Sequence, residues 1–243
     1  MSLSGKLAVI TGAGSGIGRA ACNILARDGA TIVAIDRIGA SAAATIKPLG
    51  DSHLSLEVDV SSSDNIRAAL NDTLKKYKKP PSIVVNSAGI TKDNFLLKMS
   101  EQDFDDVINV NLKGTFLVMQ NFAQAMVAHN IGGGSIVNIA SIVGKTGNMG
   151  QVNYASSKSG VESMTRVASK EFGKFNIRVN AILPGFIKSP MTDKVPDKVK
   201  EIYLQSCALK RFGQPEEIAE VISFLASDKS SFVNGASIEV TGG

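Results

Sequence analysis

The chain has 243 residues, 44% hydrophobic and 20% charged, with 23 glycines and a net charge of +4. This composition supports one sizeable core and is too weakly charged for a disordered chain. The chain has only two cysteines, nearly 190 residues apart, which argues against a disulfide scaffold. With only two histidines as well, a metal site and a Ser-His-Asp hydrolase are also disfavoured. The basic balance leaves nucleic acid, an anionic cofactor or an acidic protein as partners.

Apolar runs alternate with amphipathic stretches along the chain. The expected strands are Leu7–Thr11, Thr31–Asp36, Leu54–Asp59, Ser82–Asn86, Ser135–Ala140, Arg178–Leu183 and Ala236–Val240. The expected helices are Ile17–Asp28, Ser63–Lys78, Glu101–His129, Val152–Phe172 and Pro215–Ser227. Because most strands are apolar at successive positions, we expect burial on both faces. The pattern predicts a single α/β domain over residues 1–243, a Rossmann-type doubly wound parallel sheet of seven strands with helices on both faces.

Two segments fit this scheme less well. Residues 90–100 leave a strand without a regular pattern, and residues 188–211 are interrupted by Pro190 and Pro196. We expect the second segment to be a substrate lid. The alternative is a surface excursion without a role.

The ends of the chain and its apolar runs bear on location. No apolar run approaches the ~20 residues that span a bilayer, so we expect no membrane span. Residues 1–6 lead straight into the first strand, which leaves no room for a cleavable leader. We therefore expect an intracellular protein with reduced thiols.

A glycine-rich loop, Thr11-Gly12-Ala13-Gly14-Ser15-Gly16-Ile17-Gly18, joins the first strand to the first helix. Its glycines at 12, 16 and 18 let the backbone turn tightly and approach a pyrophosphate at the helix N-terminus. The second strand ends in Asp36, 18 residues after Gly18, where a carboxylate can hold a ribose 2′-hydroxyl. The pattern predicts a dinucleotide site, against the alternative of an ordinary strand–helix turn. Asp36 favours NAD(H), whereas Arg37 could pair with a 2′-phosphate and keeps NADP(H) open.

Tyr154 and Lys158 lie four residues apart in an expected helix and therefore share a face. A nearby ammonium stabilises phenolate, so we expect Lys158 to bring the pKa of Tyr154 down towards the working range. Ser141 follows the fifth strand, where its hydroxyl could hydrogen-bond a substrate carbonyl oxygen. The three residues predict acid–base chemistry beside the dinucleotide.

Together these residues resemble the short-chain dehydrogenase/reductase family over the whole chain. The matching motifs are Thr11-Gly12-x-x-x-Gly16-x-Gly18, Asp59-Val60, Asn86-Ser87-Ala88-Gly89, Asn111, Ser141, Tyr154 with Lys158, and Pro184-Gly185. Ser87 departs from the second asparagine that the family usually has. The resemblance implies a catalytic set of Asn111, Ser141, Tyr154 and Lys158, in which Asn111 would hold a water that relays protons to Lys158.

The resemblance also implies which residues bind cofactor and substrate. The cofactor residues would be Gly12, Ser15, Gly16, Ile17, Gly18, Asp36, Arg37, Asp59, Val60, Asn86, Ala88, Gly89, Tyr154, Lys158, Pro184, Gly185, Ile187 and Ser189. Asp59 would face adenine, Asn86 and Ala88 the ribose, and Ile187 and Ser189 the nicotinamide carboxamide. The substrate residues would be Ser141, Val143, Gln151 and Tyr154.

Within the family the chain is most similar to 3-oxoacyl-(acyl-carrier-protein) reductases and to their animal mitochondrial relative, 17-beta-hydroxysteroid dehydrogenase type 8. The similarity implies a 3-oxoacyl thioester on acyl carrier protein or CoA, with a steroid alcohol as the alternative substrate. A cofactor-binding structural subunit with little activity is the alternative of another class. The location implied is the mitochondrial matrix for an animal type 8 relative and the cytoplasm otherwise.

Partners follow from charge and from the long helices. Lys170, Lys174 and Arg178 are candidates for guiding an acidic carrier protein, although the end of the long helix at 125–129 lacks a basic cluster. Scattered basic residues and 5% aromatics argue against nucleic acid. The resemblance implies a homotetramer, or a mixed tetramer with a second carbonyl reductase. The long helices carry more apolar residues than one core-facing stripe requires, and these would be buried either between subunits or in the chain's own core. The residues are Phe116, Val118, Met119, Val161, Met164 and Val167.

Overall fold

Seven parallel strands form one sheet in the order β3-β2-β1-β4-β5-β6-β7 in the computed structural model, which describes residues 3–193 and 195–243. The strands are β1 (Leu7–Thr11), β2 (Thr31–Asp36), β3 (Leu54–Glu57), β4 (Ile83–Asn86), β5 (Gly134–Ile139), β6 (Ile177–Pro184) and β7 (Ser237–Val240). All pairings are parallel, and β1 pairs with β2 on one side and β4 on the other. The predicted fold class is confirmed.

Both faces of the sheet are buried, and successive residues of a strand enter different cores. Ala8 and Ile10 of β1 pack in one core, whereas Leu7 and Val9 pack in the other. This burial explains why the strand sequences are apolar at successive positions instead of alternating with polar residues.

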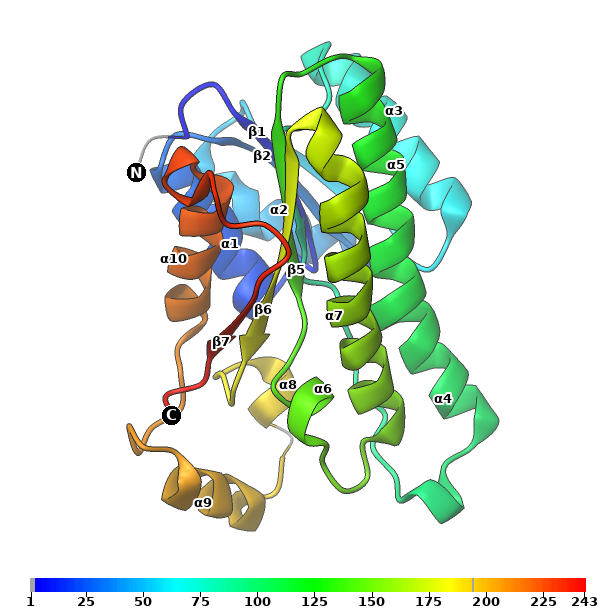
Figure 1. The fold of residues 1–243 in the computed structure, drawn as a ribbon, viewed down its shortest axis with the longest axis vertical. Coiled ribbons are helices and arrows are strands. Elements are labelled where there is room, and N and C mark those ends of the chain that lie inside the picture. The colour runs from blue at the N-terminus through cyan, green and yellow to red at the C-terminus, as the bar shows by residue number, and fades with distance from the viewer. Residues whose placement is uncertain (1–2, 194) are drawn as a thin grey trace.

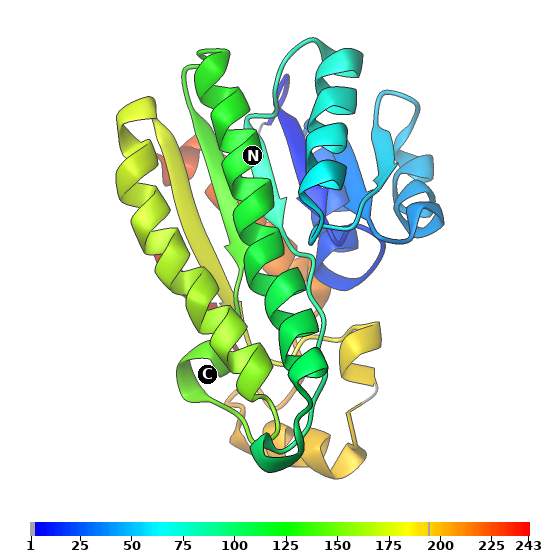
Figure 2. The same ribbon diagram turned by 90° about the vertical axis from the view of Figure 1, so that its right-hand side faces the viewer.

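The helices cover both faces of the sheet (Figures 1 and 2). On one face lie α1 (Gly16–Arg27), α2 (Gly39–Ile46) and α10 (Pro215–Ala226), and on the other α3 (Ser63–Tyr77), α5 (Gly114–Ala128) and α7 (Val152–Phe172). Pro215 occupies the first turn of α10, and the Gln214 amide donates to Glu217 Oε2 over 2.7 Å, so this helix begins where the sequence predicts. None of the described helices is both long and apolar enough to cross a membrane.

The structure differs from the expected elements in three places. The alanine-rich helix α2 is absent from the prediction, and β3 ends at Glu57, two residues earlier than expected. The long helix predicted over 101–129 is divided into α4 (Glu101–Ile108), a π-helical turn (Asn109–Lys113) and α5. The π turn adds a residue to the helical repeat and places Asn111 in the interior.

The segment predicted as a lid lies beyond the carboxyl ends of the strands (Figure 1). It contains two short helices, α8 (Pro190–Asp193) and α9 (Asp197–Ser206), and neither contributes a buried residue. Residue 194 lies outside the described residues. The absence of a core helix here agrees with the proline-interrupted sequence, and movement of the lid stays a prediction.

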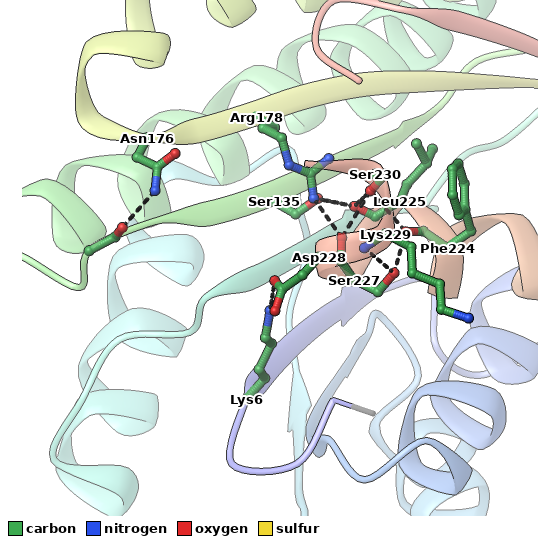
Figure 3. A network of polar contacts seen from close by, with 11 residues as sticks. Lys6, Ser135, Asn176, Arg178, Phe224, Leu225, Ser227, Asp228, Lys229 and Ser230 are labelled. Atoms are coloured by element: carbon green, nitrogen blue, oxygen red, sulfur yellow. Dashed lines mark hydrogen bonds and ion pairs between the residues drawn. The ribbon is translucent and has the colours of Figure 1, made fainter. Parts of the chain in front are cut away.

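Arg178 has a structural position that the sequence did not suggest. Its guanidinium donates to the carbonyl oxygens of Leu225 (2.7 Å) and Ser227 (3.2 Å) at the end of α10 (Figure 3). It also donates to the Val233 carbonyl (3.2 Å) beyond that helix. A cation at a helix C-terminus satisfies carbonyl groups that have no partner within the helix. Arg178 is therefore a helix cap, and a role in guiding a carrier protein stays a prediction.

Replacing Arg178 with methionine tests this assignment. We expect the free energy of unfolding, measured in urea, to fall by roughly 1–3 kcal/mol because three carbonyl groups lose a charged donor. An unchanged free energy of unfolding would contradict this structural role of Arg178.

Candidate active site

A cavity of about 330 Å³ opens at the carboxyl ends of the strands, where the chain order reverses between β1 and β4. Such switch points are where ligands bind in open α/β sheets. The cavity is lined by most of the residues predicted from the sequence: Gly12, Ser15, Gly16, Ile17, Asp36, Arg37, Asp59, Val60, Ala88, Gly89, Ser141, Tyr154, Lys158, Pro184, Gly185, Ile187 and Ser189. Residues that are distant in the chain thus line the same cavity.

The glycine loop leaves no room for side chains at two positions. Gly12 has φ +66°, and a Cβ there would lie 2.9 Å from the backbone of Ala88. A Cβ on Gly18 would collide with the carbonyl group of Gly12, so Gly18 supports the loop from behind and does not line the cavity. The loop and the N-terminus of α1 form a cradle that fits a pyrophosphate.

Asp36 holds the same loop. Its Oδ2 accepts from the Gly14 amide over 2.8 Å, and its Oδ1 accepts from the Ile38 amide over 2.9 Å. The carboxylate is thus oriented at the edge of the cavity by two backbone donors. This arrangement suits a carboxylate that accepts from a ribose diol.

Asn86, which the resemblance places along the ribose, is buried at the end of β4, and its contact with a ribose stays a prediction. Its Nδ2 donates to Asn138 Oδ1 over 2.8 Å, Asn138 Nδ2 donates to Thr165 Oγ1 over 2.9 Å, and Asn86 does not line the cavity. The amide is drawn into the sheet because a buried polar group needs a hydrogen-bond partner. Among residues 3–193 and 195–243, its Oδ1 has no such partner. Thr11 Oγ1 meanwhile accepts from the amides of Ser87 and Ala88, both over 3.1 Å, and links the glycine loop to the end of β4.

Ser141, Tyr154 and Lys158 meet at the other end of the cavity. Lys158 is 5% exposed, and its Nζ lies 5.6 Å from the centre of the Tyr154 ring and donates to the Ile139 carbonyl over 2.7 Å. The Ser141 hydroxyl forms a hydrogen bond with the Tyr154 phenol. These contacts place a phenol, a hydroxyl and an ammonium at one site.

Burial controls the protonation of this group. Burial raises the pKa of Tyr154, and the negative charge of Asp93 raises it further. The hydrogen bond with Ser141 acts in the opposite direction and lowers this pKa. Burial lowers the pKa of Lys158 to about 8. In the protein alone, desolvation of the phenolate is the largest influence, so the pKa of Tyr154 is raised; a lowering influence of Lys158 on it stays a prediction.

Asn111 lies close to Lys158 and is fully buried. Its Oδ1 accepts from the Ile90 amide (2.8 Å), and its Nδ2 donates to the Ile90 carbonyl (3.0 Å) and to Ser157 Oγ (3.1 Å). A Cβ on Gly89 would lie 3.3 Å from Asn111 Oδ1 and 3.5 Å from Lys158 Nζ, so glycine there lets both polar groups approach. Asn111 is near Lys158, as the resemblance implied, and its relay role stays a prediction.

Two predicted substrate residues lie outside the cavity lining, Val143 and Gln151. The Val143 amide donates to Ser141 Oγ over 3.2 Å and orients that hydroxyl. Gln151 Nε2 donates to Asp93 over 2.9 Å and joins the loop after β4 to the start of α7. Neither geometry tests contact with a substrate.

The structure also adds residues that the sequence reasoning missed. The additional lining residues are Ile38, Val58, Ser87, Ile90, Val110, Ile139, Ala140, Pro190, Met191 and Thr192. Several directly follow or end strands, so examining every residue at a strand's carboxyl end could have found them. No local signal identifies the three residues of the lid.

Lys158 makes a prediction about pH. Its pKa falls from 10.5 to about 8 in the folded protein, so between these values the unfolded chain binds more protons. Stability therefore rises with pH across this window. Compared with a Lys158→Met variant, the wild type should gain about 2–4 kcal/mol of unfolding free energy between pH 7.5 and 10.5, measured in urea. A constant difference between the two proteins would contradict a lowered pKa.

The fold and the site together define a dinucleotide-dependent oxidoreductase. A family model described as enoyl-(acyl carrier protein) reductase matches residues 12–243. Mouse (Mus musculus) (3R)-3-hydroxyacyl-CoA dehydrogenase is 49% identical over 253 residues, which cover 100% of this chain and 97% of that protein. The 3-oxoacyl-[acyl-carrier-protein] reductase FabG of Thermotoga maritima is 46% identical over 246 residues, which cover 100% and 99%.

A solved structure shares the fold, although it is named for a different activity. It is described as ribose-5-phosphate isomerase from Brucella melitensis 16M, and it has a TM-score of 0.93 and 32% identity over 100% of this chain and 93% of that one. The chain belongs to the short-chain dehydrogenase/reductase family, and it is an enzyme of the dehydrogenase/reductase kind. The resemblance drawn from the sequence motifs is confirmed.

Proposed function

We propose that the enzyme transfers hydride between NAD(H) and the 3-oxo or 3-hydroxy group of an acyl thioester on CoA or acyl carrier protein. The observation that carries this proposal is a single cavity with the glycine loop and Asp36 at one end and Ser141, Tyr154 and Lys158 at the other. Relatives named for 3-oxoacyl and 3-hydroxyacyl thioesters support the substrate class. The residues fit a nicotinamide dinucleotide because the cradle at Gly12 and the carboxylate of Asp36 suit its phosphates and ribose.

The chain's own groups handle the oxygen and its proton. A bound nicotinamide supplies the hydride in reduction and accepts it in oxidation. Tyr154, kept in the phenol form by burial, donates a proton to the carbonyl oxygen, and Ser141 donates a second hydrogen bond to that oxygen. Lys158 holds a positive charge close to the phenol and stabilises the phenolate that remains. Gly89 has no side chain between Asn111 and Lys158, so a proton relay can run between these two residues.

The cofactor preference rests on Asp36. A carboxylate fixed by two amides at the edge of the cavity repels a 2′-phosphate and accepts from a free diol. Arg37 lies next to it in the cavity lining and could pair with the phosphate of NADPH. The proposal is NAD(H), and NADP(H) is the alternative that the assay must test.

A matrix of initial rates tests the whole proposal. NADH and NADPH are each assayed with acetoacetyl-CoA, acetoacetyl-acyl carrier protein, crotonoyl-CoA and estrone, and the reverse reactions with the matching alcohols. We expect NADH with a 3-oxoacyl thioester to be fastest. Good estrone turnover beside negligible thioester turnover would establish the steroid alternative, and crotonoyl-CoA reduction would establish enoyl chemistry. Binding of NADH without turnover of any substrate would favour a structural subunit.

We also propose that a second subunit, either another copy or a related carbonyl reductase, covers the groove between α5 and α7. This groove has a volume of about 550 Å³, and its apolar lining includes Phe116 (41% exposed) and Val167 (53% exposed). Val118, Met119 and Val161 are buried in the chain's own core, which is the second of the two possibilities that the sequence left open, and Met119 also lines the groove. Light scattering of the purified chain should give a mass above that of the monomer, and Val167→Glu should lower that mass.

A further inference from the structure

Tyr203 is a lid residue that the proposed reaction does not use. It lies on α9, and its hydroxyl accepts from the Phe186 amide over 3.1 Å and donates to the Thr241 carbonyl over 3.0 Å. Phe186 follows the end of β6, and Thr241 follows the end of β7. One hydroxyl therefore joins the lid helix to the two backbone segments that leave neighbouring strands.

The hydroxyl lies directly behind a wall of the active-site cavity. Gly185 lines that cavity, and a Cβ on Gly185 would lie 2.7 Å from Tyr203 Oη and 3.0 Å from Thr241 Cα. The Tyr203 ring packs with Phe186, at 5.0 Å between ring centres, and with Phe212, at 5.9 Å. Glycine at 185 thus lets the phenol press against the wall, and aromatic contacts hold the phenol there.

Neighbouring parts of the wall are held by backbone pairing and by Thr192, whose Oγ1 donates to the Ile187 carbonyl over 2.7 Å. The Lys188 amide donates to the Gly213 carbonyl over 3.0 Å, and the Gly213 amide donates to the Phe186 carbonyl over 3.0 Å. The Phe186 amide instead relies on the Tyr203 side chain. Tyr203 and Thr192 are thus two side chains of the lid segment that bond the backbone of the wall, and of these two Tyr203 lies on α9.

The rest of α9 makes few contacts of this kind. Val199 and Ile202 on the same helix are exposed, at 44% and 59%. After the helix, the Leu209 amide donates to the Gly242 carbonyl over 3.0 Å. The lid is therefore anchored to the strand ends by Tyr203 and by the segment that follows α9.

We propose that Tyr203 is a positioning residue for the nicotinamide: its hydroxyl holds the wall at residues 185–187 in the shape that binds the cofactor and ties that shape to the lid. The proposal rests on the proposed function, which assigns this end of the cavity to nicotinamide. Burial raises the pKa of Tyr203, so the hydroxyl keeps its proton and both hydrogen bonds at neutral pH.

Tyr203→Phe tests the proposal, with Tyr77→Phe as the matched control. Phenylalanine keeps the aromatic cluster and removes only the hydroxyl, so we expect the variant to fold. Tyr77 also donates to a backbone carbonyl, that of Ser52 over 2.8 Å, and it lies outside the cavity lining. The Kd of NADH, measured by fluorescence titration, should rise roughly 3- to 20-fold in Tyr203→Phe because two backbone groups lose their partner. It should stay within about twofold in Tyr77→Phe.

Two further measurements separate positioning from general stability. Both variants should lose a similar, small amount of melting temperature, and only Tyr203→Phe should show faster hydrogen exchange at the Phe186 amide. Equal NADH Kd values and equal Phe186 exchange in wild type and Tyr203→Phe would overturn the role of Tyr203. Wild type that binds neither NADH nor NADPH would overturn the proposed function, and the exchange measurement would still report on the wall.

Discussion

Replacing Tyr154 with phenylalanine is expected to lower kcat for 3-oxoacyl thioester reduction by roughly 10²- to 10⁴-fold, the range that a positioned general acid contributes. The variant loses the proton donor and the hydroxyl that contacts Ser141. It keeps the ring beside Lys158, so the cavity should retain its shape. The Kd of NADH should therefore stay within about threefold of the wild type, measured by fluorescence titration beside steady-state rates.

The direction of the reaction gives a second readout for the same residue. Oxidation of the alcohol requires Tyr154 to accept a proton, and burial raises the pKa of this phenol. The oxidation rate of the wild type should therefore increase from neutral to alkaline pH, and this dependence should disappear in Tyr154→Phe. A variant that keeps most of its turnover would exclude Tyr154 as the proton donor.

Replacing Asp36 with asparagine is expected to weaken NADH binding by about 10- to 100-fold, as loss of a hydrogen bond to a charged group implies. In the protein, both carboxylate oxygens accept from amides, of Gly14 and Ile38. An amide side chain turns an NH₂ group towards one of these donors and removes the charge that opposes a 2′-phosphate. The ratio of the NADPH Kd to the NADH Kd should therefore fall.

Asp51→Asn is the matched control because Asp51 is an exposed carboxylate outside the cavity lining. Its NADH and NADPH affinities should equal those of the wild type. If Asp36→Asn left the ratio of the two Kd values unchanged, the carboxylate would not select the cofactor, and Arg37 would be the next residue to replace.

Local sequence patterns predict which residues form the site better than they predict the contacts that each of these residues makes. The glycine loop, Asp36, Ser141, Tyr154 and Lys158 were all identified from spacing and residue type, and all line one cavity. Asn86 belongs to a motif that the sequence shows clearly, yet its amide bonds Asn138 in the neighbouring strand. Spacing along the chain cannot show which of two nearby polar partners a side chain meets.

The pKa of Tyr154 likewise depends on more than the spacing of residues along the chain. A lysine four residues away on a helix suggested a lowered pKa, because two side chains on one face are close together. The folded chain surrounds both groups with protein, and desolvation of the phenolate outweighs the favourable influences on it. Burial depends on every element packed around the site, which includes residues far from Tyr154 in the sequence.

The sequence by itself determined the parallel doubly wound fold and the family, because strand hydrophobicity, helix periodicity and glycine motifs are properties of short stretches. Only the tertiary structure decided that Arg178 caps α10, that Asn111 is buried in a π turn, and that Tyr203 supports the wall at Gly185. Each of these depends on contacts between segments that are distant in the chain. Such contacts exist only once the chain is packed, and no local pattern carries them.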